Sequence, residues 1–390
     1  MKLTPLAPRP AAIAEALARR GFPGTQADAA AAGLESAAVV VDALEEPERE
    51  ALTRVARMQG IASLSGSGWV LLAGDTARLA GLARPGGTSG LPAALATPLG
   101  AALHGTFSPP EAWAMARGIV ALDRPRIMGI LNVTPDSFSD GGQWLDPDAA
   151  LAHAERLLAD GADLLDVGAE STRPGRPAPV TAAEEWRRLG PVVGDLVRRF
   201  PSVPLSVDTV KAETARRALD AGAWAINDVT GLRLDPGVAD VCAEHGAGLI
   251  VMHSRGRFAE LATYEHATYD VFMMEVAEEL EGMARTAEQH GIERGRIAVD
   301  PGFGFGKRPE QNLQLLDRLA ALRALGRPIV VGPSRKRFLG VATGREVGER
   351  DVATAAACVL AAERGAQIFR VHAVPEARDA LRLTHAVRTA

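Results

Sequence analysis

Short apolar runs alternate with amphipathic helical patterns over residues 126–390, and this alternation limits the possible folds more than any other feature of the chain. Apolar runs bounded by turn formers are typical of buried strands, and apolar residues that recur every three or four positions are typical of helices. The eight runs span residues 127–131, 164–167, 204–207, 224–226, 248–251, 297–299, 328–331 and 367–371. The eight helical patterns span residues 148–159, 182–200, 212–221, 237–244, 269–290, 310–325, 352–364 and 376–387.

Glycine follows several of the predicted helices, as in Asp160-Gly161-Ala162 and His245-Gly246-Ala247. A helix C-terminus favours glycine because the residue there often takes a left-handed backbone conformation. Eight strands that alternate with eight helices predict a closed (β/α)8 barrel, the TIM barrel of the α/β class. An open doubly wound sheet with one misread strand is the alternative.

Residues 1–120 are rich in alanine, glycine and proline and differ from the rest of the chain. Helices are predicted over residues 11–20 and 47–58 and short strands over residues 38–41 and 69–72, which gives a small α+β unit. Its polar residues show neither metal-ligand spacing nor a phosphate-binding loop, so packing, oligomerisation or partner binding is favoured over a second active site. The expected domains are this N-terminal extension, residues 1–120, and the catalytic barrel, residues 121–390.

The composition predicts a cytoplasmic protein that binds neither membranes nor nucleic acids. Hydrophobic residues make up 47% and charged residues 23% of the 390 residues, and no apolar run approaches the roughly 18 residues of a membrane span. The net charge of −5 argues against general nucleic-acid binding. Cys242 and Cys358 lie in apolar helical stretches, which indicates a reducing compartment. Residues 1–10 lack the apolar core of a secretory signal.

Polar residues follow each of the eight predicted strands, at the end where barrel enzymes carry their reacting groups. One such residue alone is often a helix cap, and Asp208 or Thr209 fits a cap for the helix near Lys211. Capping does not explain why all eight strand ends carry amide, carboxylate or cationic groups. In chain order these groups are Asn132, Asp166 with Glu170 to Pro174, Asp208-Thr209, Asn227-Asp228, Met252 to Arg255, Asp300, Ser334 to Lys336, and Arg370 with His372.

The mixture of groups indicates a ligand with two different halves. Carboxylate and amide oxygens suit a flat heterocycle that donates from ring N–H and amino groups, and Asp208, Asn227 and Asp300 supply them. Cationic groups suit the anionic oxygens of a phosphate. Four are present: Arg173, Lys336, Arg370 and His372. The amide oxygen of Asn132 suits a Mg²⁺ ion that is otherwise bound by phosphate and water.

Three other kinds of site do not fit the sequence. Residues 302–307, GFGFGK, miss the G-x-x-x-x-G-K-[ST] spacing of a nucleotide-binding loop, and Arg308 stands where Ser or Thr is needed. Zinc-ligand spacing is absent among His253, His266, His372 and Cys242. Ser171 and Ser334 lack the G-x-S-x-G setting of a hydrolase nucleophile.

Seven separated motifs resemble, in order and spacing, those of the dihydropteroate synthase family, the folate-pathway enzymes that sulfonamides inhibit. They are ILNVTPDSFSDGG (130–142), DVGAESTRPG (166–175), SVDT, INDVTG, DPGFGFGK, GPSRK and RVH. The resemblance covers about residues 124–390 and leaves out the first 120 residues.

The resemblance implies a homodimer that transfers a 7,8-dihydropterin-6-ylmethyl group from its diphosphate to the amine of 4-aminobenzoate and releases diphosphate. The implied pterin contacts are Asp208, Asn227, Met252, Asp300 and Lys336. The implied Mg²⁺-diphosphate contacts are Asn132, on the metal, with Arg173, Arg370 and His372. The implied aminobenzoate pocket is lined by Thr172, Pro174, Phe305 and Ser334, and the loops 136–142 and 171–175 complete it.

The same resemblance implies catalysis by Asp208, Lys336, Arg173 and Thr172. Mg²⁺, two arginines and a histidine would spread the charge of the leaving diphosphate, so that C–O cleavage runs ahead of attack and leaves a pterin methylene cation. Asp208 would stabilise that cation. The aminobenzoate amine needs no base before it attacks, and loop closure would exclude water.

Two stretches depart from the family's pattern. Ala373 follows Arg370-Val371-His372 where Asp is usual, and the segment 258–269 after Ser254-Arg255 leaves the outer rim of the pocket undefined.

Two rival functions remain. One rival is a pterin-dependent methyltransferase with a corrinoid partner, which would not need the motifs that handle diphosphate and aminobenzoate. The other is a non-catalytic homologue that acts as a binding subunit, and the intact site residues disfavour it.

Overall fold

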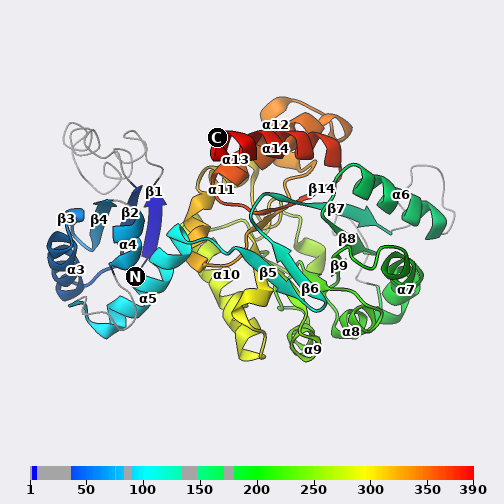
Figure 1. Cartoon of the computed structure of the whole chain (residues 1–390), viewed down its shortest axis with the longest axis horizontal. Coiled ribbons are helices and arrows are strands. Elements are labelled where there is room, and N and C mark those ends of the chain that lie inside the picture. Colours follow the sequence, from blue (N-terminus) through cyan, green and yellow to red (C-terminus); the bar gives the residue numbers. More distant parts are fainter. Residues whose placement is uncertain (1, 7–36, 75, 83–89, 134–146, 171–179) are drawn as a thin grey trace. The chain divides into compact units, whose positions relative to one another are not determined.

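The structure, a computed structural model, describes residues 2–6, 37–74, 76–82, 90–133, 147–170 and 180–390 (Figure 1). The chain divides into two compact units. The first comprises Met1–Pro109 with Ala320–Gly326, and the second comprises Pro110–Leu319 with Arg327–Ala390. None of the described helices is long and apolar enough to cross a membrane.

The described part of the second unit contains a parallel sheet of eight strands in the order β12-β11-β10-β9-β8-β7-β14-β13. An isolated parallel bridge between Val299 and Ile329 joins the two outer strands, so the sheet closes on itself. The expected (β/α)8 barrel is therefore confirmed, and the open-sheet alternative is wrong. The strands are β7 Arg126–Asn132, β8 Leu164–Gly168, β9 Leu205–Asp208, β10 Ala225–Asp228, β11 Gly248–Met252, β12 Ile297–Asp300, β13 Val330–Val331 and β14 Ile368–Val371.

Helices surround this sheet in Figure 1 and follow the strands in sequence. The described helices of this unit are α6 Pro147–Ala159, α7 Ala182–Arg199, α8 Ala212–Asp220, α9 Gly237–His245, α10 Phe272–Gln289, α11 Pro309–Asp317, α12 Arg337–Thr343, α13 Asp351–Glu363 and α14 Val374–Thr389. All eight helical patterns are confirmed as helices, except that residues 319–325 form a 3₁₀ segment rather than the end of α11. The sequence does not predict α12, since seven residues are too few for a clear periodicity.

A hairpin, β5 Ala112–Met115 and β6 Gly118–Ala121, fills the N-terminal end of the barrel. Its Trp113 is fully buried against apolar side chains from seven strands, and its Nε1 donates to the Arg296 carbonyl oxygen at 2.9 Å. We call these strand residues the barrel floor: Met128, Leu164, Ala225, Ile250, Ala298, Val330 and Ile368. Residues 112–120 belong to the expected N-terminal domain, but here they complete the barrel core.

The first unit contains an antiparallel sheet in the order β1-β2-β4-β3. Its described elements are β1 Lys2–Leu6, β2 Ala37–Asp42, α3 Glu46–Met58, β3 Ala62–Gly66, β4 Trp69–Gly74, α4 Thr76–Gly81 and α5 Ala93–Phe107. The α+β class and the elements predicted over residues 38–41, 47–58 and 69–72 are confirmed, whereas the helix predicted over residues 11–20 lies outside the described residues. The sequence does not predict β3, because Leu64 is the one large apolar residue in ASLSG, or α5, because Pro98 interrupts its pattern.

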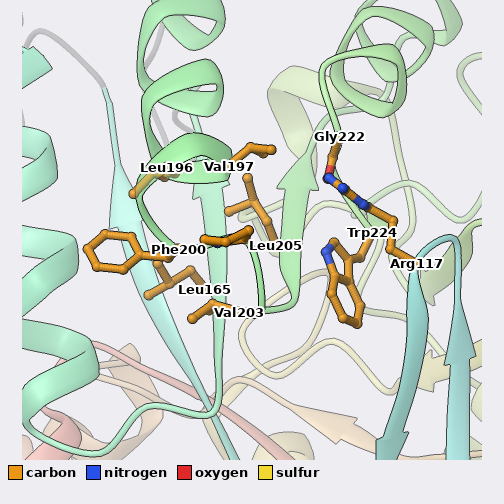
Figure 2. A pocket seen from close by; sticks show the side chains of 10 residues that line it. Arg117, Leu165, Leu196, Val197, Phe200, Val203, Leu205, Gly222 and Trp224 are labelled. Atoms are coloured by element: carbon orange, nitrogen blue, oxygen red, sulfur yellow. The ribbon is translucent and has the colours of Figure 1, made fainter.

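Figure 2 shows a narrow crevice between α7, the strands β8 and β9, and the side chains of Arg117 and Trp224. Leu165 and Leu205 lie near the N-terminal ends of their strands, away from the polar residues at the C-terminal ends. The volume of the crevice, about 10 Å³, is close to that of a single water site. Its walls are apolar, with Leu165, Leu205 and Phe200 among them, and Arg117 donates to the Gly222 carbonyl oxygen at 3.3 Å. The crevice is therefore a packing gap rather than a ligand site.

Candidate active site

The strand residues two positions beyond the barrel floor are polar on several strands. Alternate residues of a strand face the same side, so Asp166, Asn227, Asp300 and Arg370 share the interior with Leu164, Ala225, Ala298 and Ile368. Strand register brings the ends of β7 to β10 to similar levels, because Asn132 pairs with Gly168, Gly168 with Asp208, and Asp208 with Asn227. Met252 likewise pairs with Asp300. The structure therefore brings most of the predicted pterin and diphosphate residues to one mouth of the barrel.

Arg370 links two carboxylates in this mouth. Its Nε donates to Asp166 Oδ2 at 2.6 Å and its Nη2 donates to Asp208 Oδ2 at 3.1 Å. Asp166 is fully buried and also accepts from Asn227 Nδ2 at 3.1 Å. The sequence places Asp166 at a strand end, but only the structure shows that it holds two of the predicted ligand contacts. Its position two residues after the apolar Leu164 is the signal that could have identified it.

The carboxyl groups of Asp208 and Asp300 have raised pKa values. Burial raises the pKa of Asp208, although the adjacent Arg370 acts in the opposite direction. Burial also raises the pKa of Asp300 to about 6, against the opposing effect of the Gly302 N–H, which donates to Asp300 Oδ1 at 2.7 Å. Buried carboxylates without a full set of partners favour a ligand that brings N–H donors or positive charge.

An apolar wall stands beside these groups. Phe305 and Met252 belong to one buried cluster with Val210, Val229 and Leu261. The Nζ atom of Lys336 lies 3.9 Å from the centroid of the Phe305 ring, a cation–π contact. Met252 and Lys336, which are predicted to bind the pterin, therefore lie beside Phe305, which is predicted to line the aminobenzoate pocket.

Residues 302–307 form the turn that carries Phe305. Gly302 has φ +69°, and a Cβ atom there would lie 2.0 Å from the carbonyl oxygen of His253, so only glycine fits. The buried Lys307 Nζ donates to the carbonyl oxygens of Gly302 and Phe305 at 3.1 and 3.0 Å and lies 2.8 Å from His253 Nδ1. This lysine holds its own turn together, so GFGFGK is not a nucleotide-binding loop.

Ser334 and His372 are hydrogen-bonded to each other. Ser334 Oγ lies 2.9 Å from His372 Nδ1 and accepts from the His372 backbone N–H at 3.2 Å. Burial, reinforced by Arg370 and other cations, lowers the pKa of His372 to about 3. This histidine is therefore a neutral group near pH 7 in the absence of a ligand.

Several strand-end residues have structural roles instead. Asp228 is fully buried and accepts from Thr230 and from the Leu232 backbone N–H, so it fixes the turn after β10. Thr209 Oγ1 accepts from the Lys211 backbone N–H at 3.3 Å, as a residue near a helix start does.

The two departures from the family's pattern have simple structural consequences. Ala373 is the N-cap of α14 and makes no side-chain capping bond, so what an Asp could supply there is a helix cap. In the segment 258–269, Leu261 is buried in the apolar wall and the Tyr269 hydroxyl donates to the Gly306 carbonyl oxygen at 2.9 Å. That segment therefore forms a packed rim.

Some predicted residues lie outside the described part of the chain. These are Thr172, Arg173 and Pro174, with the loop 136–142 and the rest of the loop 171–175. Among the described residues, one cluster has metal-ligand types, and its members, Glu260, Glu265 and His266, lie on the rim segment rather than in the barrel mouth.

Residues 128–372 match the family described as pterin binding enzyme. The dihydropteroate synthase of Mycobacterium leprae is 42% identical over 269 residues, which are 67% of this chain and 93% of the relative. A probable bifunctional folylpolyglutamate synthase/dihydropteroate synthase of Halobacterium salinarum is 48% identical over 270 residues, 68% of this chain and 32% of the relative, so the chain spans about a third of that protein. The structure of Xanthomonas albilineans dihydropteroate synthase with 4-aminobenzoic acid is 47% identical and has a TM-score of 0.67, with coverage of 72% of this chain and 99% of that chain.

Proposed function

The chain belongs to the pterin-binding enzymes and, among them, to the dihydropteroate synthases, and we propose on this premise that it joins a 7,8-dihydropterin-6-ylmethyl group to 4-aminobenzoate. The methylene group would leave a diphosphate, and the products would be 7,8-dihydropteroate and diphosphate in folate synthesis. The observation that carries the proposal is the group of three polar acceptors, Asp208, Asn227 and Asp300, at the mouth of a barrel with an apolar floor.

A pterin ring matches these acceptors through its amino group and ring N–H groups. Asn227 donates its amide N–H to Asp166, which can only accept, so its amide oxygen is available to accept from the ligand. Asp300 would accept from the same edge of the ring. Lys336 would donate to a ring acceptor, and Met252 would pack against a ring face.

The diphosphate would bind through Arg370 and His372, together with Arg173. Arg370 uses two of its N–H groups on Asp166 and Asp208, and its other N–H groups can bind phosphate oxygens. Asn132 fits Mg²⁺, because an amide oxygen is an acceptable ligand and no described residue hydrogen-bonds the half-buried Asn132 side chain. When bound, Mg²⁺ would neutralise charge on the leaving diphosphate.

Bond cleavage would then leave positive charge on the pterin methylene group. Asp208, on β9, would stabilise that charge, and Lys336 would hold the ring in place. Thr172, Pro174, Phe305 and Ser334 would orient 4-aminobenzoate so that its amine attacks the methylene carbon. No residue would need to remove a proton before the attack.

A homodimer is the assembly that we propose for this enzyme. Several large apolar side chains on α12 to α14 are exposed, and a second copy of the chain would cover them. They are Val341, Val352, Leu360, Leu383 and Val387, with Val347 between α12 and α13.

One assay tests this function against its rivals. The full chain, with the pterin diphosphate, 4-aminobenzoate and Mg²⁺, should release one diphosphate for each dihydropteroate formed. A chain that binds the pterin but releases no diphosphate would support the non-catalytic rival. Methyl transfer from methyltetrahydrofolate to a corrinoid protein would support the methyltransferase.

A further inference from the structure

Three charged side chains outside the proposed ligand contacts form a buried group beside Asp208. Lys211 Nζ lies 2.6 Å from Glu170 Oε2 and 3.2 Å from Glu185 Oε2. The exposed fractions of the side chains are 15% for Lys211, 12% for Glu170 and 1% for Glu185. We call these three residues the buried triad.

The buried triad connects three parts of the barrel. Glu170 follows β8, Lys211 is the N-cap of α8, and Glu185 lies in the first turns of α7. Glu185 Oε2 also accepts from the hydroxyls of Thr209 and Thr214, at 3.0 and 2.7 Å. Because Thr209 directly follows Asp208, the triad is anchored to the end of β9.

Glu170 also connects the end of β8 with Val180, which lies ten positions later in the sequence. Its Oε1 accepts the backbone N–H of Val180 at 2.8 Å. Arg188 of α7 donates to the carbonyl oxygen of Ala169 at 3.3 Å, which fixes the same strand end from a second side. Glu170 and Val180, the described residues on either side of the stretch 171–179, are thus held together near the end of β9.

Stability alone is a weak reason for this arrangement. The triad places two carboxylates against one ammonium, burial raises the pKa of Glu185, and Glu185 Oε1 has no hydrogen-bond partner among the described residues. Buried ion pairs often cost as much in desolvation as they return in attraction, and apolar residues of similar size are often as stabilising. A role in positioning the neighbouring chain explains why the three residues of the triad are charged rather than apolar.

We propose that Glu170, Lys211 and Glu185 are positioning residues for the transfer reaction, and that they act by fixing both ends of the stretch that carries Thr172, Arg173 and Pro174. The inference rests on the proposed function, which gives those three residues to aminobenzoate and diphosphate. Glu170 and Val180 lie on either side of this stretch, so the contacts of the triad fix the point where the chain leaves β8 and the point where it leads into α7. The triad therefore sets the affinity for the second substrate more than for the pterin.

The test compares Glu170→Gln with Glu213→Gln, an exposed glutamate on α8 that pairs with Arg217. Glu170→Gln loses a charge-assisted contact worth about 1.5–3 kcal/mol, so the KM for 4-aminobenzoate should rise by about tenfold or more. Affinity for the pterin substrate alone, measured by calorimetric titration, should stay within about twofold. Lys211→Arg, which keeps the charge, should lose less than Lys211→Met, and Glu213→Gln should behave as the wild type.

Hydrogen exchange at the Val180 amide gives a readout that does not depend on activity. Exchange should be slow in the wild type and faster in Glu170→Gln and Lys211→Met. An unchanged KM for 4-aminobenzoate in Glu170→Gln, or equal losses of affinity for both substrates together with a lower Tm, would overturn the inference. A wild-type chain that releases no diphosphate contradicts the proposed function instead, and the exchange rates then still decide whether the triad holds Val180.

Discussion

Arg370 on β14 donates from Nε to Asp166 on β8 over 2.6 Å, so it joins two strands that β7 separates in the sheet. Asp166 is fully buried, and its loss would leave the guanidinium and the Asn227 amide without their shared acceptor. Since breaking a buried ion pair costs about 3–5 kcal/mol, Asp166→Ala should lower the free energy of unfolding by about 3 kcal/mol in urea titrations. Asp123→Ala, which removes an exposed partner of Arg126, is the control and should leave stability unchanged.

Replacement by alanine should have opposite effects on the stability of the protein at Gly302 and at Gly282. An Ala at 302 would need φ +69° and would place its Cβ 2.0 Å from a carbonyl oxygen, so it should destabilise the protein by about 2–3 kcal/mol or more. Gly282 lies inside α10, and a Cβ atom added there would meet nothing within 4 Å, so Gly282→Ala should stabilise by about 0.5–1 kcal/mol. Thermal unfolding of both variants checks the contrast, and a tolerated Gly302→Ala would show that the turn can rearrange.

Asp300 should give the free energy of unfolding a specific pH dependence. Its folded carboxyl, with a pKa of about 6, keeps a proton between about pH 4 and 6 that the unfolded chain has released, so stability falls as the pH rises through this window. The wild type should therefore lose about 2–3 kcal/mol relative to Asp300→Asn between pH 4 and pH 7. Urea titrations across this range measure the difference. A constant difference would mean that the folded and unfolded carboxyls titrate alike.

Lys336 provides a test of the pterin assignment. Replacement by Ala removes a charge-assisted contact, so affinity for the pterin diphosphate should fall by about tenfold to a hundredfold in calorimetric titrations. Arg345→Ala, at an exposed position near the end of α12, should have no effect. Unchanged pterin affinity in Lys336→Ala would remove this lysine from the proposed pocket.

Two truncations separate the roles of the N-terminal unit and the hairpin. A chain that lacks residues 1–109 keeps Trp113 and should keep most of its diphosphate release. A chain that lacks residues 1–121 exposes the barrel floor and should be unstable, because loss of one buried aromatic side chain alone costs about 3–5 kcal/mol. The point substitution Trp113→Ala should reproduce much of this loss in the full chain. A folded but inactive 1–109 deletion would show that the barrel is not sufficient for catalysis.

The barrel could be predicted from the sequence because each βα unit carries its own local signals. Strand ends such as Asp300 and glycines such as Gly246, which caps α9 at φ +57°, follow from short-range patterns. The hairpin could not be assigned in this way, since Trp113 is buried by residues spread over most of the barrel. Local patterns place a residue on an element, but they do not identify its partners on distant strands.

The same limit applies to the candidate site. The sequence indicates which residues reach the barrel mouth, and the structure places Asp208, Asn227, Asp300 and Arg370 there. It does not indicate that Asp166 connects Arg370 with Asn227, because that contact depends on the register of the five strands from β14 to β10. Nor does it indicate that His372 is neutral, since burial and nearby cations, rather than residue type, lower its pKa.

Trp113 has a further consequence for how the chain reaches its native state. The residues that bury Trp113 are spread along the sequence as far as Ile368, so they span most of the barrel. Contacts between distant residues slow folding, because long stretches of chain must be ordered before those contacts form. We therefore expect the indole of Trp113 to stay exposed until the last strand has joined the sheet, so its burial would mark the final closure step rather than the early formation of helices.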